Sequence, residues 1–246
     1  MTRARLFSLR LAASASVLAL AFLVIRLLWF PSGYFQIFGV GKLFLMMAGA
    51  ALIVGPTLST LVFRPGKKGL KFDLGVLAAV ELIAIAWGMT EIAARRPVYA
   101  VFAVDRFEAV AAAEIDMAQI RYAEHVDWPG QGPRLAYAEL PTDVEVMNRL
   151  IDETVLYGMA DIDRRPEFWK PYPRGLVVIK AAAAPLSDLL SIDDSRGAVI
   201  HKWLRSRKMS AAELVFLPIR GSKGDGAIIL HADIGYPVDV LPVDPW

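Results

Sequence analysis

Residues 43–63 form a run of 21 residues without a single charged side chain. At a helical rise of about 1.5 Å per residue, such a run spans roughly 30 Å, the thickness of a bilayer's hydrocarbon core. Two more apolar runs lie nearby, residues 11–30, interrupted by Arg26, and residues 74–94, interrupted by two glutamates. The first 96 residues therefore predict three transmembrane helices.

Composition and charge divide the chain at the same place. Hydrophobic residues make up 56% of its 246 residues, above the roughly 45–50% of a soluble domain. Residues 1–96 hold eleven Lys and Arg and three Asp and Glu, and the totals of 27 and 25 leave 16 bases and 22 acids for the rest. A nucleic-acid binder would carry its basic surface on its folded domain. Here that domain is acidic, so nucleic acid is excluded as a partner.

The three arginines within the first ten residues precede the first apolar run and allow two interpretations. A signal peptide has an apolar part of about 7–15 residues and a small-residue cleavage site. This run is longer and ends in Trp29-Phe30-Pro31, which favours a retained anchor in membrane lipid. By the positive-inside rule the N-terminus and the basic residues 64–71 are cytoplasmic. Three spans then place residues 97–246 in the periplasm of a Gram-negative cell.

Small residues and one acid mark the second and third spans. Ala51, Gly55 and Ser59 recur every four residues, a pattern that lets helices approach closely. They pack against the chain's own spans or against a partner's transmembrane helix. Glu81 lies well inside the third run, where an ionisable group is a functional candidate by default. At helical rise, Arg26 and Glu81 differ by about 12 Å in their position along the membrane normal. We therefore expect Glu81 to be protonated or hydrogen-bonded to Ser59 or to a backbone carbonyl. A role of Glu81 in transport is a minor alternative.

Residues 97–246 predict a small α+β domain that follows the three helices. Alternating apolar residues, helical periodicity and turn residues separate the predicted elements. The predicted strands are 97–105, 134–140, 213–220, 227–233 and 237–241, and the predicted helices are 143–157, 176–190 and 195–207. The second helix is expected to break before Pro185. The helix at 143–157 has an apolar stripe of Val144, Met147, Ile151 and Val155.

Sequence motifs for catalysis or cofactor binding are absent. The chain has no cysteine, and His125, His201 and His231 lack the spacing of a metal site. The glycines at residues 221–226 are expected to form a hairpin turn. The acids at 193–194 are expected to cap a helix, and Asp161 and Asp163 to lie in a solvated loop. No nucleophile, base and oxyanion group come together. We therefore expect no enzyme, no cofactor and no metal.

Four aromatic residues stay ambiguous at this point. Trp128, Phe168, Trp169 and Tyr172 lie in or near a proline-punctuated loop at residues 164–174. They belong either to the core or to a surface that faces a partner.

Three strings, taken together, resemble the TfpX/TfpZ family of type IV pilin accessory proteins. They are GPTLSTLVFRPGKKGLKFDL at residues 55–74, RPVYAVFAVDRFEAV at residues 96–110, and FLPIRGSKGDGAIIL with VLPVDPW at residues 216–246. They follow one another in order over the whole chain. The chain departs from the family pattern at Ala51, where the family has an acidic residue. The role of that acidic residue is therefore either absent from this chain or taken over by Glu81.

The resemblance implies a bacterial inner-membrane protein that stabilises a type IV pilin subunit before it enters the fibre, as a chaperone does. The pilin presents an apolar helix in the membrane and a globular head outside. Helix contacts are then expected at Ala51, Gly55, Ser59 and Glu81, and head contacts at Asp105, Arg106, Phe107, Phe168, Trp169 and Tyr172. The alternative is a membrane-anchored periplasmic sensor or ligand-binding protein without catalytic activity, although residues 64–72 are too short for a cytoplasmic output domain.

Overall fold

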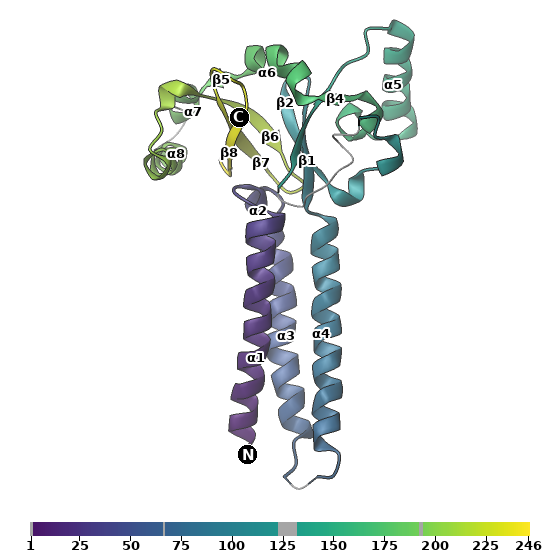
Figure 1. The fold of residues 1–246 in the computed structure, drawn as a ribbon, viewed down its shortest axis with the longest axis vertical. Coiled ribbons are helices and arrows are strands. Elements are labelled where there is room, and N and C mark those ends of the chain that lie inside the picture. Colours follow the sequence, from purple (N-terminus) through teal and green to yellow (C-terminus); the bar gives the residue numbers. More distant parts are fainter. Residues whose placement is uncertain (1, 66, 123–131, 192–193) are drawn as a thin grey trace. The chain divides into compact units, whose positions relative to one another are not determined.

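The structure, a computed structural model, describes residues 2–65, 67–122, 132–191 and 194–246. The chain divides into two compact units, whose elements are labelled in Figure 1. The first unit contains residues 1–29 and 40–95, and the second contains residues 30–39 and 96–246. The second unit is thus built from two separate segments of the chain.

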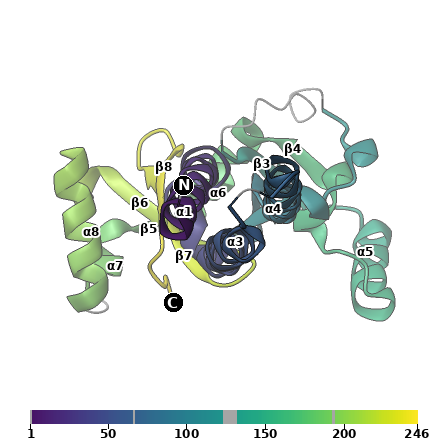
Figure 2. The same ribbon diagram turned by 90° about the horizontal axis from the view of Figure 1, so that it is seen from below.

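Three long helices form the first unit (Figure 2). They are α1 (Arg3–Val24), α3 (Val40–Val62) and α4 (Leu70–Ala94), and a π-helical stretch at Ile25–Trp29 prolongs α1. All three are long and apolar enough to cross a membrane, in agreement with the three predicted spans. Each begins before its apolar run, because polar and basic residues also fit on a helix and hydropathy marks only the apolar part.

The three helices meet through α3, which packs against both α1 and α4. Leu18, Ala48, Ala51 and Ile85 form a small buried cluster at this meeting point. Most other large apolar side chains of α4 are exposed: Phe72, Val76, Val80, Leu82, Ile83 and Trp87. In a bilayer they would face acyl chains or another protein.

A mixed sheet organises the second unit, with eight strands in the part of the chain that the structure describes. The strands are β1 (Pro97–Ala103), β2 (Arg106–Ala111), β3 (Arg134–Ala138), β4 (Trp169–Pro171), β5 (Ala184–Pro185), β6 (Leu214–Arg220), β7 (Asp225–His231) and β8 (Pro237–Leu241). Their order is β4-β3-β1-β2-β6-β7-β8, with β5 pairing with β6 outside this path. The pairs β1–β3 and β2–β6 are parallel and the others are antiparallel.

Short helices surround the sheet. They are α2 (Tyr34–Ile37), α5 (Val144–Tyr157), α6 (Leu176–Ala182), α7 (Leu186–Leu190) and α8 (Asp194–Arg207). Single 3-10 turns lie at Ala112–Glu114, Met117–Gln119, Ile162–Arg164, Pro166–Phe168, Tyr172–Gly175 and Ala211–Glu213. The predicted break before Pro185 is confirmed, because α6 ends at Ala182 and Pro185 belongs to β5.

Strand β2 is the main element that the sequence did not predict. The two-residue turn at Val104 and Asp105 joins it to β1, and Val104 has a φ of 60°. Hairpin turns of this kind normally carry Gly, Asn or Asp at positive φ, and a β-branched residue there is uncommon. The sequence therefore carried no hairpin signal at this position.

The sheet has two apolar clusters, one in each half. One cluster contains residues of β1 and β3 together with Trp169. The other contains residues of β6, β7, β8, α7 and α8. The halves join where β2 pairs with β6, and this junction contains only the pairs Phe107–Ile219 and Glu108–Arg220.

Residues 30–39 pack on the sheet unit, although the sequence predicted Phe30 as the end of the first span and residues 31–39 as part of the connection to the second. Gly33 N donates to Val240 O at 2.9 Å, and Lys223 N donates to Ile37 O at 2.9 Å. The apolar side chains Phe30, Tyr34, Ile37 and Phe38 are all at most 5% exposed. The segment therefore supplies core to the second unit.

Asp239 of β8 ties this segment to α8. Its carboxylate accepts hydrogen bonds from Ser32, from Trp203 Nε1 at 2.8 Å and from Arg207 Nη2 at 2.9 Å. Burial raises the pKa of Asp239, but these hydrogen bonds and one from the Val240 amide outweigh it, so the pKa lies below its usual value.

Candidate functional site

A largely buried ion pair joins α1 to α4 within the three-helix unit. Arg10 Nη2 lies 2.7 Å from Glu81 Oε2, and the two side chains are 17% and 10% exposed. The Ser14 hydroxyl donates to the same carboxylate, and Arg10 Nε donates to Ser59 Oγ at 3.1 Å. These four residues, which we call the polar cluster, link all three helices.

The polar cluster explains how the unit tolerates two charges among apolar helices. A lone charge inside a membrane or a protein core is costly, and an opposite charge with good hydrogen bonds offsets much of that cost. Arg10 neutralises Glu81, and the two serines occupy further hydrogen-bonding positions. The cluster thus acts as a structural link between helices.

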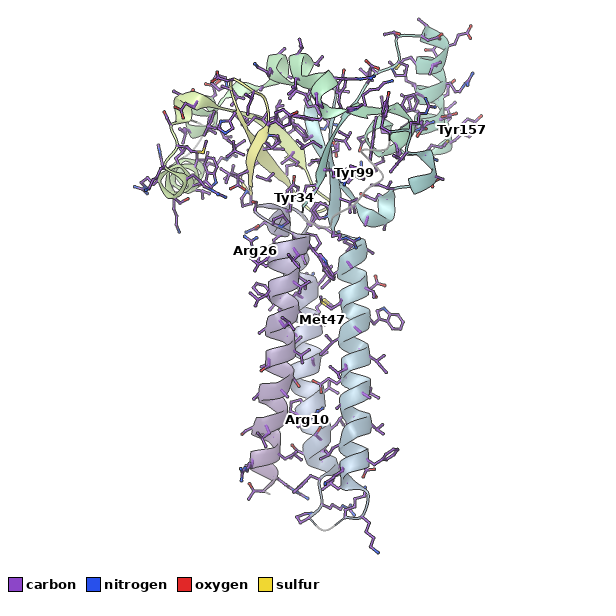
Figure 3. All side chains as sticks on the ribbon, in the orientation of Figure 1. Arg10, Arg26, Tyr34, Met47, Tyr99 and Tyr157 are labelled. Atoms are coloured by element: carbon purple, nitrogen blue, oxygen red, sulfur yellow. The ribbon has the colours of Figure 1, made fainter. Side chains whose placement is uncertain are left out.

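Arg10 is the partner of Glu81 that the sequence did not predict. The sequence places Arg26 about 12 Å from the level of Glu81 along the helix axis, and Figure 3 shows Arg10 and Arg26 at separate levels of the first helix. Ser59 reaches Glu81 only through Arg10, and no direct bond of the predicted kind is seen. The missed signal was the spacing of Arg10 and Ser14, which lie one turn apart on one helix face.

Gly55 allows the polar cluster to form. A Cβ atom at Gly55 would lie 2.4 Å from Glu81 Oε2 and 2.6 Å from its Cδ, so any side chain would displace the carboxylate. Ser59 is fully buried and Ala51 is 7% exposed. Much of the small-residue stripe thus packs against the chain's own helices.

An apolar groove of about 470 Å³ lies between α3 and α4. Its lining residues are Met47, Ala50, Ala51, Val54, Gly55 and Leu58 from α3, and Leu77, Val80, Glu81, Ala84, Ile85, Trp87 and Gly88 from α4. Glu81 is the one ionisable residue among them, and Met47 is labelled in Figure 3. Ala51 and Gly55 thus contribute to the groove, whereas Ser59 lies behind it against Arg10.

The turn after β1 holds two of the predicted head contacts at the surface. Asp105 is exposed and pairs with Arg106 at 3.0 Å. Arg106 Nε also donates to Glu108 at 2.8 Å. Phe107 is fully buried, with its ring centroid 5.4 Å from that of Phe102. The turn can therefore offer Asp105 and Arg106 to a partner, but not Phe107.

The aromatic residues of the predicted loop belong mainly to the core. Trp169 is fully buried, and its indole donates to Ile162 O at 3.3 Å. Tyr172 is 4% exposed and donates its hydroxyl to Gly235 O at 2.5 Å. Phe168 is half-buried beneath the Arg165 guanidinium, 5.1 Å from its ring centroid.

The expectation that Phe107, Trp169 and Tyr172 contact a partner directly is thus corrected. The loop of Trp169 pairs with β3 as strand β4, and this pairing turns the aromatic rings inward. The prolines had suggested an exposed loop. Trp128 lies outside the described residues.

A charge cluster surrounds Glu108 at the junction between the halves of the sheet. Glu108 is 5% exposed and lies 4.0 Å from both an Arg164 Nη1 and an Arg220 Nη1 atom. Asp163, expected in a solvated loop, is instead 5% exposed and pairs with Arg164. Burial raises the pKa of Asp163 to about 6, against the lowering effect of Arg164 and with further raising by nearby carboxylates.

Potential metal-binding side chains are scattered over the part of the chain that the structure describes. Within it, no three His, Cys, Asp or Glu residues are placed to hold a metal ion. His125 and Asp193 lie outside that part. The predicted hairpin turn at residues 221–226 is confirmed, since Gly221 N donates to Gly224 O at 2.9 Å between β6 and β7.

The chain is similar to proteins of Dichelobacter nodosus that carry the name fimbrial assembly protein. It is 27% identical to that of serogroup I over 211 residues, which are 84% of this chain and 81% of that protein. It is 28% identical to that of serogroup E1 over 207 residues, 82% and 79% of the two chains. For serogroups C1 and C2 the identity is 32% over 104 residues, 42% of this chain and 79% of that protein. No family model and no solved structure matches the chain.

Proposed function

This chain belongs to the family of fimbrial assembly proteins, and we propose that it is a membrane accessory protein of type IV pilus biogenesis, of the TfpX/TfpZ kind. It stabilises a pilin subunit in the inner membrane before the subunit enters the fibre. Its N-terminus is cytoplasmic, and its sheet unit lies in the periplasm. Its role is binding, without an enzymatic step or a cofactor.

The observation that supports this proposal best is the groove between α3 and α4. Between helices in lipid, association depends on close packing and not on the hydrophobic effect, so small residues at the contact favour it. The groove has such residues at Ala50, Ala51, Gly55, Ala84 and Gly88. The apolar helix of a subunit that awaits assembly is a fitting occupant. Asp105, Arg106 and Phe168 remain proposed contacts for its head.

Two measurements test the proposal together: the steady-state level of the pilin subunit in cells that lack this protein, and crosslinking in native membranes. The chain has no cysteine, so a single cysteine at Ala84→Cys in the groove gives one defined crosslinking position. Ala79→Cys is the matched control, because Ala79 is an exposed α4 residue outside the groove.

We expect the subunit level to fall in cells without the protein, and a crosslink to the subunit from position 84 but not from position 79. A normal subunit level together with no crosslink would show that the protein has another role.

A further inference from the structure

Helix α5 turns most of its predicted apolar stripe away from the core of the second unit. Val144 is 70% exposed, Ile151 is 50% exposed and Val155 is 73% exposed. Leu150 reaches the core, and Met147, the fourth member of the stripe, packs partly beside it. The inner face of α5 is therefore centred near Leu150.

A cavity of about 330 Å³ lies against this inner face, within the second unit. Val146, Leu150 and Glu153 line it from α5, where spacings of three and four residues place them on one side of the helix. Three further arginines, one glutamate and one aromatic residue complete the lining: Arg121, Arg149, Arg165, Glu167 and Phe168. We call this site the α5 cavity.

Arg165 fixes the two carboxylates of the α5 cavity. Its Nη1 donates to Glu153 Oε2 at 2.6 Å, and its Nε donates to Glu167 Oε1 at 2.8 Å. The guanidinium also lies over the Phe168 ring, 5.1 Å from the centroid. A wall that is ordered before a ligand binds loses little conformational entropy in the complex.

This wall keeps a net negative charge, because one guanidinium is shared between two carboxylates. Glu167 Oε2 is buried and has no hydrogen-bond donor among the described residues. The second oxygen of Glu153 accepts no hydrogen bond from them either, and the Glu153 side chain is 27% exposed. Glu153 can therefore accept a hydrogen bond from a positively charged group of a ligand.

The other two arginines of the α5 cavity have no acidic partner in the described part of the chain. Arg121 and Arg149 are both exposed. Glu145 and Asp152 lie about one helical turn from Arg149, but no ion pair within 4.0 Å forms with either arginine there. A guanidinium binds a carboxylate through two parallel hydrogen bonds. These arginines can therefore bind the carboxylate of a ligand.

We propose that the α5 cavity binds a free amino acid with an apolar side chain. Its carboxylate binds to Arg121 and Arg149, its ammonium group donates to Glu153, and its side chain packs against Val146 and Leu150. The volume is at the small end of the roughly 300–1,000 Å³ of ligand pockets, which suits a ligand of this size. The site lies in a different unit from the groove between α3 and α4, and it does not rest on the proposed function.

The test is titration of the purified full chain in detergent micelles with L-leucine, followed by saturation-transfer NMR. L-leucinamide is the matched ligand without a carboxylate, and N-acetyl-L-leucine is the matched ligand without an ammonium group. We expect L-leucine to bind and both controls to bind about tenfold more weakly or less, because each loses one charged hydrogen-bonding group.

Two variants test whether L-leucine binds in the α5 cavity. Arg121→Gln and Arg149→Gln are each expected to weaken binding several-fold, and both should keep the unfolding temperature of the unchanged protein, since the two arginines are exposed. Arg205→Gln is the matched control, because Arg205 is an exposed arginine of α8 outside the cavity. It should leave binding unchanged.

The proposal is overturned if L-leucine does not bind, or if it binds equally to the Arg121→Gln and Arg149→Gln variants. Equal binding of L-leucinamide would exclude recognition of the carboxylate, and equal binding of N-acetyl-L-leucine would exclude recognition of the ammonium group. Displacement of L-leucine by an equal concentration of inorganic phosphate would make the site a phosphate site instead. None of these measurements involves a fimbrial subunit, so their failure leaves the proposed function standing. Likewise, loss of the crosslink from Ala84→Cys leaves the α5 cavity standing.

Discussion

The ion pair of Arg10 and Glu81 affects the stability of the three-helix unit. Replacing either residue by an apolar one leaves the other charge without its partner. Glu81→Leu is expected to lower the free energy of unfolding by up to about 3–5 kcal/mol, since it leaves a largely buried arginine uncompensated. The measurement is denaturant or thermal unfolding of the full chain in detergent micelles.

The double variant Arg10→Leu with Glu81→Leu is the control for this prediction. Replacing both charges by apolar side chains removes the desolvation cost as well as the attraction, so stability should return close to that of the unchanged protein. If the double variant were as unstable as Glu81→Leu, the lost stability would come from helix packing and not from the uncompensated charge.

Asp163 gives the sheet unit a predicted dependence on pH. Burial raises the pKa of its carboxyl to about 6, whereas an aspartate in the unfolded chain titrates near 3.9. The folded protein therefore binds the proton of the Asp163 carboxyl more tightly than the unfolded chain does. This proton binding stabilises the fold fully below the pKa of the unfolded chain, and the contribution is lost as the pH rises through about 6.

Asp163→Asn removes this titration. We expect the stability of the variant relative to the unchanged protein to increase between about pH 4 and pH 7, as measured by denaturant unfolding at several pH values. Asp152→Asn, at an exposed aspartate, controls for the loss of one charge. Parallel pH profiles for the Asp163→Asn variant and the unchanged protein would contradict the raised pKa.

At the scale of elements, the contact between α3 and α4 can be tested without touching the polar cluster. Ala84→Phe places a large side chain in the groove, whereas Ala79→Phe places it on the exposed side of α4. We expect the first variant to reduce co-purification of the subunit several-fold and the second to leave it unchanged. Both variants must retain the unfolding temperature of the unchanged protein, which shows that only the groove has been altered. Equal co-purification with both would exclude the groove as the binding site.

At the scale of the whole molecule, the second unit depends on a segment far from it in sequence. Residues 30–39 bury Phe30, Tyr34, Ile37 and Phe38 against the sheet unit. Burial of each such side chain contributes roughly 1.5–3 kcal/mol. A fragment of residues 96–246 alone should therefore unfold at a lower denaturant concentration and bind more of a hydrophobic dye than the same fragment with residues 30–39 attached through a flexible linker. Equal unfolding midpoints would show that the segment is not part of the core.

Local patterns were sufficient to predict most elements of this fold. The long apolar runs predicted the three helices, and alternation and turn residues predicted β1, β3, β6, β7 and β8. Strand β2 was missed because Val104 stands at a turn position where glycine or asparagine is usual. Strand β4 was missed because it has only three residues, which lie in a proline-rich segment, and its pairing with β3 makes it a strand.

The candidate site was less predictable, because its contacts join residues far apart in sequence. The small-residue stripe and Glu81 were visible in the sequence, but Arg10 is 71 residues from Glu81 and was counted with the charges that flank the first span. On α5, periodicity identified an apolar stripe but not the side that faces the core. A helical stripe records only that one face is apolar, and the outward direction of Val144 and Val155 follows from where the helix packs.

Periodicity and composition within a few turns of chain were enough to predict the three long apolar helices, the charge division, the separation into helical and mixed parts, and most strands. The tertiary structure alone decided the partner of Glu81, the burial of Phe107, Trp169 and Tyr172, the place of residues 30–39 in the sheet unit, and the exposure of the α5 stripe. Each of these depends on which distant surfaces meet, and the free energy of such contacts is gained only when the whole chain has folded.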